Sequence, residues 1–309
     1  MVGVHAWFEF YRLRFTFRAV HEIAFPIGKA GNVLRGGFGL VLRTVACERE
    51  CAEGACAEHG RCAYARLFEP VRTIPGPSGF SDPARPFVFR ASHLDGRRFL
   101  PGESFHFDLH VFETRQPALE VLHMTFSQLA REGFGGTRGR AELIAAEQLD
   151  LVGHAQADAR ERRAPLRVSL QADAEPVSRL AVDFMTPTEL KSRDVLIAEP
   201  RFSVLLARAR DRVTTLRALN GAAPLNIDYK ALGERARDVA MTRCDLRQVA
   251  ISRTSSRTGQ THPLGGFVGT AEYGGDLREF VPWLSAARFT GVGRQTAWGK
   301  GEIQLRVPA

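Results

Sequence analysis

The segment FTGVGRQTAWGKG, residues 289–301, has a Gly-x-Gly pair at each end of a five-residue stretch. A predicted helix precedes it and the last predicted strand follows it, whereas a dinucleotide-binding fingerprint needs a strand before it and a helix after it. Glycine lets backbone N–H groups come close to a ligand, and successive N–H groups can hold a phosphate. The segment therefore predicts a phosphate-binding loop, with a glycine-rich structural hairpin as the alternative.

Side chains in the same segment favour RNA as the ligand. Arg294 and Lys300 add positive charge, and Trp298 offers a ring on which a base can stack. The predicted RNA-binding residues are Gly291, Gly293, Arg294, Gln295, Trp298, Gly299, Lys300 and Gly301.

The composition also favours an anionic partner. The chain has 309 residues, with 42 Lys and Arg against 34 Asp and Glu, and the formal charge is +8. Nearly all of the cations are arginine, whose fork matches phosphate, although a GC-rich genome would also favour arginine over lysine. The sequence has no run of eighteen apolar residues and no secretory pattern, so we expect a cytoplasmic protein without a membrane segment.

The order of predicted elements in the first half is strand, helix, strand, strand, helix, strand. In the first strand, Leu13, Phe15 and Phe17 alternate with polar residues, and Pro26 and Gly28 end the element. The predicted strands are 13–25, 86–90, 105–112 and 141–151, and the predicted helices are 30–45 and one that Pro117 opens.

The second half repeats this order. The predicted strands are 180–185, 245–253, 266–272 and 302–306, and the predicted helices are 202–216 and one from an Asp276 cap to Leu284. The repeat predicts an α+β fold of two tandem ferredoxin-like (βαββαβ) domains. The expected parts are a first domain at 1–155, a linker at 156–170 and a second domain at 171–309, with a Cys-rich insertion and loop at 46–86.

The insertion contains the second motif of the chain. Spacers of three, four and five residues separate Cys47, Cys51, Cys56 and Cys62. Four thiolates this close can enclose Zn²⁺ or hold an iron–sulfur cluster, and reduced free thiols are the alternative. His59 is a substitute ligand, and Cys244 is expected to be a small core residue.

Further motifs accompany the glycine-rich segment in both halves of the chain. They are LRGGFG at 34–39, GGTRGR at 135–140, FMTPTELK at 184–191 and HPLGGFVG at 262–269. Together with the two Gly-x-Gly pairs, they resemble the RAMP superfamily, and within it the CRISPR-associated processing endoribonucleases of the Cas6 type.

The resemblance implies metal-independent cleavage of CRISPR repeat RNA with no catalytic cofactor. The 2′-hydroxyl would attack the phosphorus, giving 2′,3′-cyclic phosphate and 5′-hydroxyl ends, with the help of a base, an acid and cations. In many family members the base is a histidine near the first helix. The implied partners are repeat RNA, subunits of a CRISPR effector complex and a second copy of the chain.

The candidate catalytic residues lie around the first helix. His21 is the nearest histidine, but it shares the apolar register of the first strand, so a half-buried structural histidine is the alternative. Lys29 and Arg35 lie where a helix start favours phosphate, with a solvated helix start as the alternative. His262 is a further candidate. His106 and His110 are expected to be surface residues.

Two other functions remain open from the sequence. One is a non-catalytic RAMP subunit that binds guide RNA, which the absence of a clear histidine on the first helix favours. The other is a metal-stapled adaptor that binds protein, for which RNA binding would be weak and insensitive to salt.

Overall fold

The computed structural model describes residues 6–47, 60–70, 84–156, 164–192, 195–254 and 261–307. The chain forms two compact units. The N-terminal unit comprises Phe10–Gly76 and Phe80–Leu166, and the C-terminal unit comprises Met1–Glu9, Pro77–Gly79 and Arg167–Ala309.

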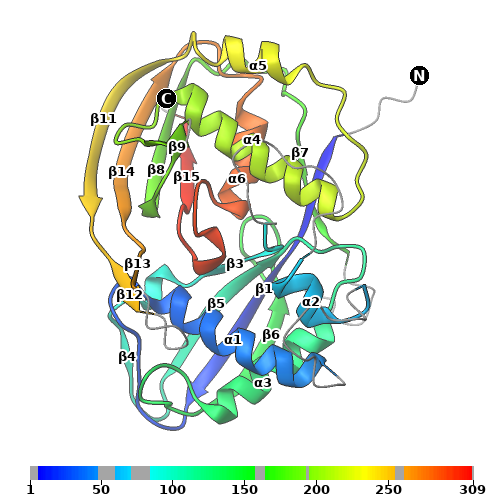
Figure 1. Ribbon diagram of the computed structural model, residues 1–309, viewed down its shortest axis with the longest axis vertical. Coiled ribbons are helices and arrows are strands. Elements are labelled where there is room, and N and C mark those ends of the chain that lie inside the picture. The colour runs from blue at the N-terminus through cyan, green and yellow to red at the C-terminus, as the bar shows by residue number, and fades with distance from the viewer. Residues whose placement is uncertain are drawn as a thin grey trace. The chain divides into compact units, whose positions relative to one another are not determined.

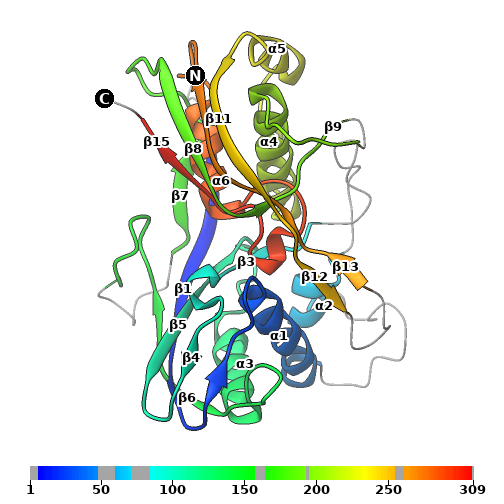
Figure 2. The same ribbon diagram turned by 90° about the vertical axis from the view of Figure 1, so that its left-hand side faces the viewer.

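The main sheet of the N-terminal unit is antiparallel. Its strand order is β3 (Phe87–Arg90), β5 (Ser104–Val111), β1 (Trp7–Ala19), β6 (Ala141–Gln148). Helices α1 (Ala30–Ala46) and α3 (Leu119–Glu132) pack against each other and cover one face of this sheet (Figures 1 and 2). Alternate apolar residues of β1 are buried, as the sequence pattern predicts.

Phenylalanine rings join this sheet to its helices. The Phe126 ring on α3 lies 4.4 Å from that of Phe15 and 5.2 Å from that of Phe38 on α1, measured between ring centres. Such ring pairs contribute about 0.5–1.5 kcal/mol each beyond the burial of their area. The cluster therefore fixes α1, and the residues at its start, against the sheet.

The C-terminal unit repeats the arrangement. Its antiparallel strand order is β11 (Ala240–Val249), β14 (Gly266–Gly274), β8 (Arg179–Thr188), β15 (Ile303–Arg306). Helices α4 (Phe202–Leu219) and α6 (Val281–Thr290) pack together beside it (Figure 1). In both units the sheet order is second, third, first and fourth strand of the repeat, which confirms the tandem α and β organisation.

The structure contains further short elements; Ile23–Ala24 lies within the predicted strand 13–25, Ser252–Thr254 overlaps the predicted strand 245–253, and the others were not predicted. The short elements are β2 (Ile23–Ala24), α2 (Ala63–Phe68), η1 (Ser92–Leu94), β4 (Arg98–Phe99), β7 (Leu166–Ser169), β9 (Lys191–Ser192), β10 (Val195–Leu196), α5 (Tyr229–Arg235), β12 (Ser252–Thr254), β13 (Thr261–Pro263) and η2 (Thr296–Trp298). Within the described ranges, no helix is both long and apolar enough to cross a membrane.

Several predicted boundaries are wrong: the strand predicted at 245–253 spans Ala240–Val249, and the one predicted at 141–151 ends at Gln148. The first strand ends at Ala19, because the chain bends at His21 before β2 begins. Asp276 does not cap the helix that follows it, since α6 begins at Val281 with Phe280 at the N-cap position. Asp228 is a true cap: its carboxylate accepts hydrogen bonds from the amides of Lys230 and Ala231 at the start of α5.

Candidate functional site

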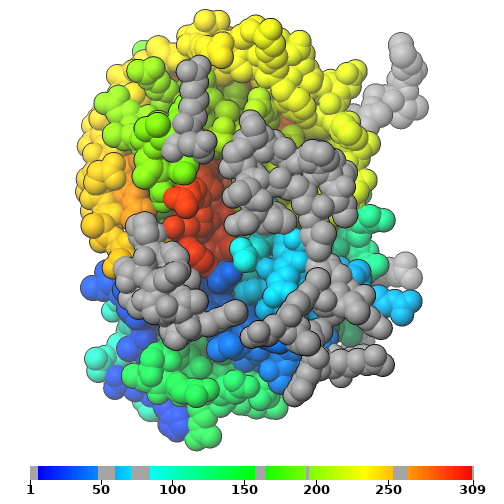
Figure 3. Space-filling view, viewed as in Figure 1, coloured from blue at the N-terminus to red at the C-terminus, as the bar shows by residue number. Residues whose placement is uncertain are grey.

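The segment from Gly291 to Gly301, here called the glycine loop, connects α6 to β15. All four of its glycines have positive φ angles, between 68° and 78°. This left-handed conformation costs other residues about 1–2 kcal/mol each. The glycines are therefore required by the path of the backbone. Figure 3 shows part of this C-terminal segment, coloured red, at the molecular surface.

The glycines also allow the protein's own backbone to come close. A Cβ on Gly301 would collide with the carbonyl oxygen of Val292, and a Cβ on Gly293 would collide with that of Glu189 at the end of β8. The close approach that we expected toward a ligand is thus made, at these two positions, toward the chain itself.

Six amides of the loop are used inside the protein. Val292 N–H donates to the Gly301 carbonyl at 2.8 Å, and Gly301 N–H donates to the Pro187 carbonyl at 3.1 Å. The other four amides that donate to protein carbonyls belong to Gly291, Arg294, Trp298 and Gly299. These six donors hold the loop in shape, so a bound phosphate cannot use them at the same time.

Thr186 fastens the loop to β8. Its buried hydroxyl donates to the Gly299 carbonyl at 2.9 Å and accepts from the Glu302 amide at 3.0 Å. Thr186 was not among the predicted site residues, although it lies inside the FMTPTELK motif. The motif was a usable signal, because it joins the first strand of the repeat to the glycine loop.

The two cations of the loop are in different environments. Arg294 is exposed, and its guanidinium donates to Glu189 Oε1 at 2.7 Å. Lys300 is buried. Gln295, just before η2, and Trp298, its last residue, are partly exposed. Arg294, Gln295 and Trp298 are therefore the loop side chains that a ligand in solution can reach.

His21 is exposed in the bend after β1, so the expectation of a half-buried register position is wrong. Arg140 Nε donates to His21 Nδ1 at 3.3 Å, and Arg140 Nη2 lies 3.3 Å from His21 Nε2. Arg140 comes from the GGTRGR motif, where Gly139 allows the chain to pass against the Glu22 carbonyl. The structure thus joins a histidine and a motif that the sequence analysis considered separately.

The start of α1 already binds a carboxylate. The Ala30 amide donates to Asp95 Oδ1 at 2.8 Å, so the positive end of the helix dipole is partly compensated from within the chain. The Arg35 guanidinium lies over the Phe68 ring, 5.2 Å from its centre. The described contacts of Lys29 are made by its backbone, whose N–H donates to Pro26. His21, Lys29 and Arg35 thus each meet a different neighbour.

The histidines of β5 differ from expectation. His110 is buried, with its ring 5.9 Å from that of Phe10, so its prediction as a surface residue is wrong. His106 is half-buried and its ring stacks on that of His93 at 4.8 Å. Burial, followed by the nearby Arg14 charge, lowers the pKa of His106, which favours its neutral form.

The polar face of β1 carries a buried ion pair. Asp108 accepts hydrogen bonds from Arg14 Nε at 2.7 Å and from Arg12 Nη2 at 3.2 Å. Burial favours the protonated carboxyl, but the two arginines outweigh it and lower the pKa of Asp108. This pair fixes the arginines of β1 to β5, so they are committed to the fold.

Two of the four clustered cysteines lie within the described residues. The sulfurs of Cys47 and Cys62 are 3.7 Å apart, while Cys51, Cys56 and His59 fall outside the described ranges. Within the part of the chain that is described, no group of three or more metal-ligating side chains occurs.

Cys244 is exposed on β11, so its prediction as a core residue is wrong. His262 lies on β13, and its side chain is outside what the structure describes.

Comparisons with known proteins agree with this architecture. A family model for an N-terminal domain, AF_1859_N, matches residues 8–166, more than half of the chain. The model of the CRISPR-associated endoribonuclease Cas6 matches residues 182–303, which include the glycine loop. No curated protein gave a significant match.

Several solved structures share the fold. A Cas6 product complex has a TM-score of 0.58 and 16% identity, and the match covers 97% of this chain and 100% of that one. A Thermus thermophilus Cas6 has a TM-score of 0.53 and 16% identity, covering 97% and 99%. A partial Cas6-RT-Cas1–Cas2 complex has a TM-score of 0.56 and 12% identity, covering 97% and 46%. The Cas6 model thus identifies residues 182–303 as the domain of a CRISPR-associated Cas6-type endoribonuclease, and the solved structures show that the chain shares the Cas6 fold.

Proposed function

We propose that this Cas6-family chain cuts CRISPR precursor RNA within the repeat, without a metal ion, and leaves 5′-hydroxyl and 2′,3′-cyclic phosphate ends. The observation that carries this proposal is the match of the Cas6 endoribonuclease model to residues 182–303. This region runs from β8 to β15 and contains the glycine loop with its accessible Arg294 and Trp298.

The chemistry requires two proton transfers and charge neutralisation. The 2′-oxygen bonds to phosphorus as the bond from phosphorus to the 5′-oxygen breaks; a base takes the 2′-hydroxyl proton and an acid protonates the leaving oxygen. Among the predicted catalytic residues, His21 is exposed and is the one whose side chain is an imidazole, the commonest proton-transfer group in enzymes. Lys29 and Arg35 remain the proposed sources of positive charge for the phosphorane.

RNA binding at the loop is proposed for the side chains that solvent reaches. Arg294 can contact a phosphate, Trp298 can stack on a base and Gln295 can donate to either. Gly291, Gly293, Gly299, Gly301 and the buried Lys300 then act by shaping the loop.

Incubation of the purified protein with its own repeat RNA in EDTA tests the proposal. We expect one cut at a fixed position, with a product whose 3′ end resists phosphatase until acid opens the cyclic phosphate. Tight binding without a fixed cut would overturn the proposal in favour of the non-catalytic guide-RNA-binding subunit.

A structural zinc ion is proposed at the cysteine motif. Two sulfurs held tetrahedrally at about 2.3 Å from Zn²⁺ lie about 3.8 Å apart. The 3.7 Å between Cys47 and Cys62 is close to that spacing and far from the roughly 2 Å of a disulfide. Cys51 and Cys56 are the other proposed ligands.

Metal analysis tests the zinc site. The wild-type protein should hold about one zinc per chain, and Cys62→Ser should lose it, whereas the matched control Cys244→Ser should keep it. If the purified protein instead contained iron and absorbed visible light, the site would hold an iron–sulfur cluster and not zinc. If both Cys47 and Cys62 were alkylated in the untreated protein and no metal were bound, the two residues would be free thiols and the zinc proposal would fail.

Four further predictions concern the fold, the partners and the location of the protein. We propose that each unit is a ferredoxin-like domain, since both have the βαββαβ order with the same strand arrangement. Association with other CRISPR proteins is supported by the similar structure described as part of a Cas6-RT-Cas1–Cas2 complex. A homodimer and a cytoplasmic location remain expectations from the sequence.

A further inference from the structure

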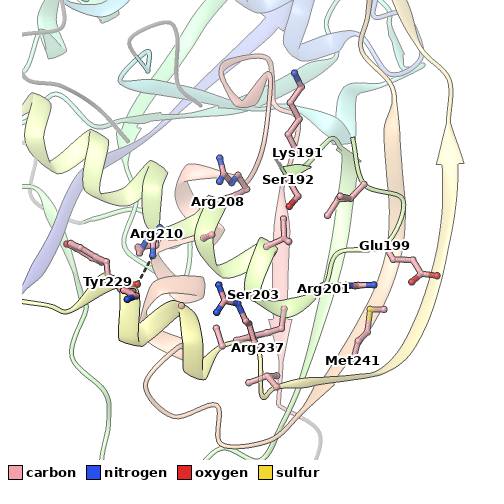
Figure 4. A pocket seen from close by; sticks show the side chains of 18 of the residues that line it. Lys191, Ser192, Glu199, Arg201, Ser203, Arg208, Arg210, Tyr229, Arg237 and Met241 are labelled. Carbon is pink, nitrogen blue, oxygen red and sulfur yellow. Dashed lines mark hydrogen bonds between the residues drawn. The ribbon is translucent and has the colours of Figure 1, made fainter. Parts of the chain in front are cut away.

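The C-terminal unit contains a large groove that the sequence analysis did not predict. The groove has a volume of about 1260 Å³ and is lined by β9, the first turns of α4, α5 and the start of β11 (Figure 4). This exceeds the roughly 300–1,000 Å³ of most small-molecule pockets. We call it the α4–α5 groove.

Positive charge dominates the lining. The cations that line the groove are Lys191, Arg201, Arg208, Arg210, Lys230 and Arg237. Glu199 is the one carboxylate among the described lining residues. Asp211, behind the wall, pairs with Arg210 at 2.7 Å and with Arg208 at 3.5 Å. The two carboxylates offset at most two of the six positive charges.

The remaining cations have no such compensation. Among the described residues, no carboxylate forms an ion pair with Lys191, Arg201, Lys230 or Arg237. Some arginines elsewhere on the same unit are paired: Arg306 with Asp183 and Arg235 with Glu279, each at 2.6 Å. Arg179 and Arg247 of the same unit also have no carboxylate partner among the described residues, so the groove differs from the rest of the unit in gathering several such cations in one place.

The start of α4 adds a second source of positive potential. This 18-residue helix begins at Phe202, with Arg201 at the N-cap position. Within the described chain, no side chain caps it and its first turn contains no acid. Arg201 and Ser203 line the groove at this end (Figure 4). An anion there would meet both the arginine and the positive end of the helix dipole.

The chemistry of the lining favours phosphate groups over bases. Phe202 is buried beneath the surface. The Tyr229 ring is covered by the Arg210 guanidinium, 5.3 Å from the ring centre, and burial raises the pKa of its hydroxyl. With Phe202 buried and one face of Tyr229 covered, the groove offers little aromatic surface for stacking. Contacts limited to phosphates position a nucleic acid without reading its sequence.

We propose that the α4–α5 groove is a second RNA-binding site, separate from the glycine loop, which holds a stretch of phosphate backbone. This inference rests on the proposed function, since it takes RNA as the polyanion that the protein handles. None of the groove's described lining residues comes from Gly291–Gly301.

The test compares two triple variants of the full chain. The groove variant is Arg201→Ala with Lys230→Ala and Arg237→Ala. The control variant is Arg235→Ala with Arg243→Ala and Arg306→Ala, three ion-paired arginines of the same unit that lie outside the groove. Both variants lose three positive charges. The probe is the repeat RNA with every 2′-hydroxyl methylated, so that affinity is measured in the absence of cleavage.

The groove variant should bind this RNA with a salt dependence reduced by about 2 in the slope of log Kd against log salt, and about 100-fold more weakly at 0.1 M salt. The control variant should stay close to wild type. Equal slopes and affinities for the groove variant and the wild type would overturn the inference. The inference would also fail if the groove variant bound RNA normally but lost binding to polyglutamate. The groove would then be a surface for acidic protein segments.

Cleavage of unmodified repeat RNA separates this inference from the proposed function. If wild type cuts and the groove variant binds equally well, the groove inference fails and the enzyme remains. If wild type does not cut but the groove variant loses RNA affinity, the groove is confirmed and the nuclease proposal fails. In the groove variant, we expect a raised KM with the cut position and kcat unchanged.

Discussion

The glycine loop and the α4–α5 groove, both in the C-terminal unit, hold their cations in opposite ways. In the loop, Arg294 is paired with Glu189 and six amides bond to protein carbonyls. In the groove, Arg201, Lys230 and Arg237 have no carboxylate partner among the described residues. The loop is a rigid, internally satisfied shape, and the groove is an open concentration of charge.

This difference separates what a motif encodes from what a surface binds. The glycine pattern follows from the backbone, because all four positions have positive φ angles and Gly293 and Gly301 also lie against carbonyl oxygens. Cations that bind phosphate need only lie near each other in space, so they leave no pattern in the sequence. The first was therefore visible in the sequence and the second was not.

The largest expected effect comes from a substitution in the glycine loop. Gly301→Ala should lower the free energy of unfolding by about 2–5 kcal/mol, because it combines a left-handed backbone with a Cβ that meets the Val292 carbonyl. Urea denaturation measures the change. Gly233→Ala is the control: a Cβ there meets nothing within 4 Å on α5, so stability should hold or rise.

Thr186→Val should lower the free energy of unfolding by about 1–3 kcal/mol, because it leaves the Gly299 carbonyl and the Glu302 amide without their hydroxyl partner. Thr186→Ser, which keeps the hydroxyl, should recover most of the loss. If the serine variant were as unstable as the valine variant, packing of the methyl group would be the cause.

Glu189→Gln should strengthen RNA binding. The substitution releases Arg294 from its ion pair while the Glu189 carbonyl still holds the loop backbone. Because exposed ion pairs are worth about 0.2–1 kcal/mol, Kd should fall roughly 2- to 5-fold. Fluorescence anisotropy with methylated repeat RNA checks this. If neither Glu189→Gln nor Arg294→Ala changed the Kd for RNA, Arg294 would not be part of the binding site.

The smallest effect concerns Asp183 on the C-terminal sheet, the ion-pair partner of Arg306. Arg306 and, less strongly, Thr270 hold the pKa of Asp183 below its ordinary value of 3.8. A lowered folded-state pKa stabilises the fold above the unfolded pKa of about 4, and the stabilisation disappears as the pH falls through the folded value. Asp183→Asn should therefore cost about 1 kcal/mol or less at pH 7. A cost that persists at pH 2 would show that packing, not charge, is responsible.

The periodic elements were the most predictable part of the fold. Alternation in β1 and the helical spacing in α1, α3 and α4 reflect one buried face each, so the pattern survives in the sequence. Short elements such as α5 and the β12–β13 hairpin have too few residues for a period to show. Their position is set by tertiary contacts.

The candidate site was predictable in shape but not in contacts. The glycine loop was identified from spacing, yet two of its amides and the Gly299 carbonyl bond to residues 186–189, more than a hundred residues earlier. His110 was expected at the surface because it alternates with apolar residues, but that face of β5 is also covered, with Asp108 buried beneath Arg12 and Arg14. Where both faces of a strand are covered, alternation of polar and apolar residues does not predict which side chains are exposed.

The most direct test of the proposed reaction is cleavage of repeat RNA in which the nucleotide before the cut carries a 2′-deoxy sugar. The account predicts that this single change abolishes the cut in EDTA while the affinity for RNA stays within about 2-fold, because the attacking oxygen is gone and the phosphate contacts remain. Cleavage of the deoxy substrate at the same position would contradict it, since the nucleophile could not then be the 2′-hydroxyl.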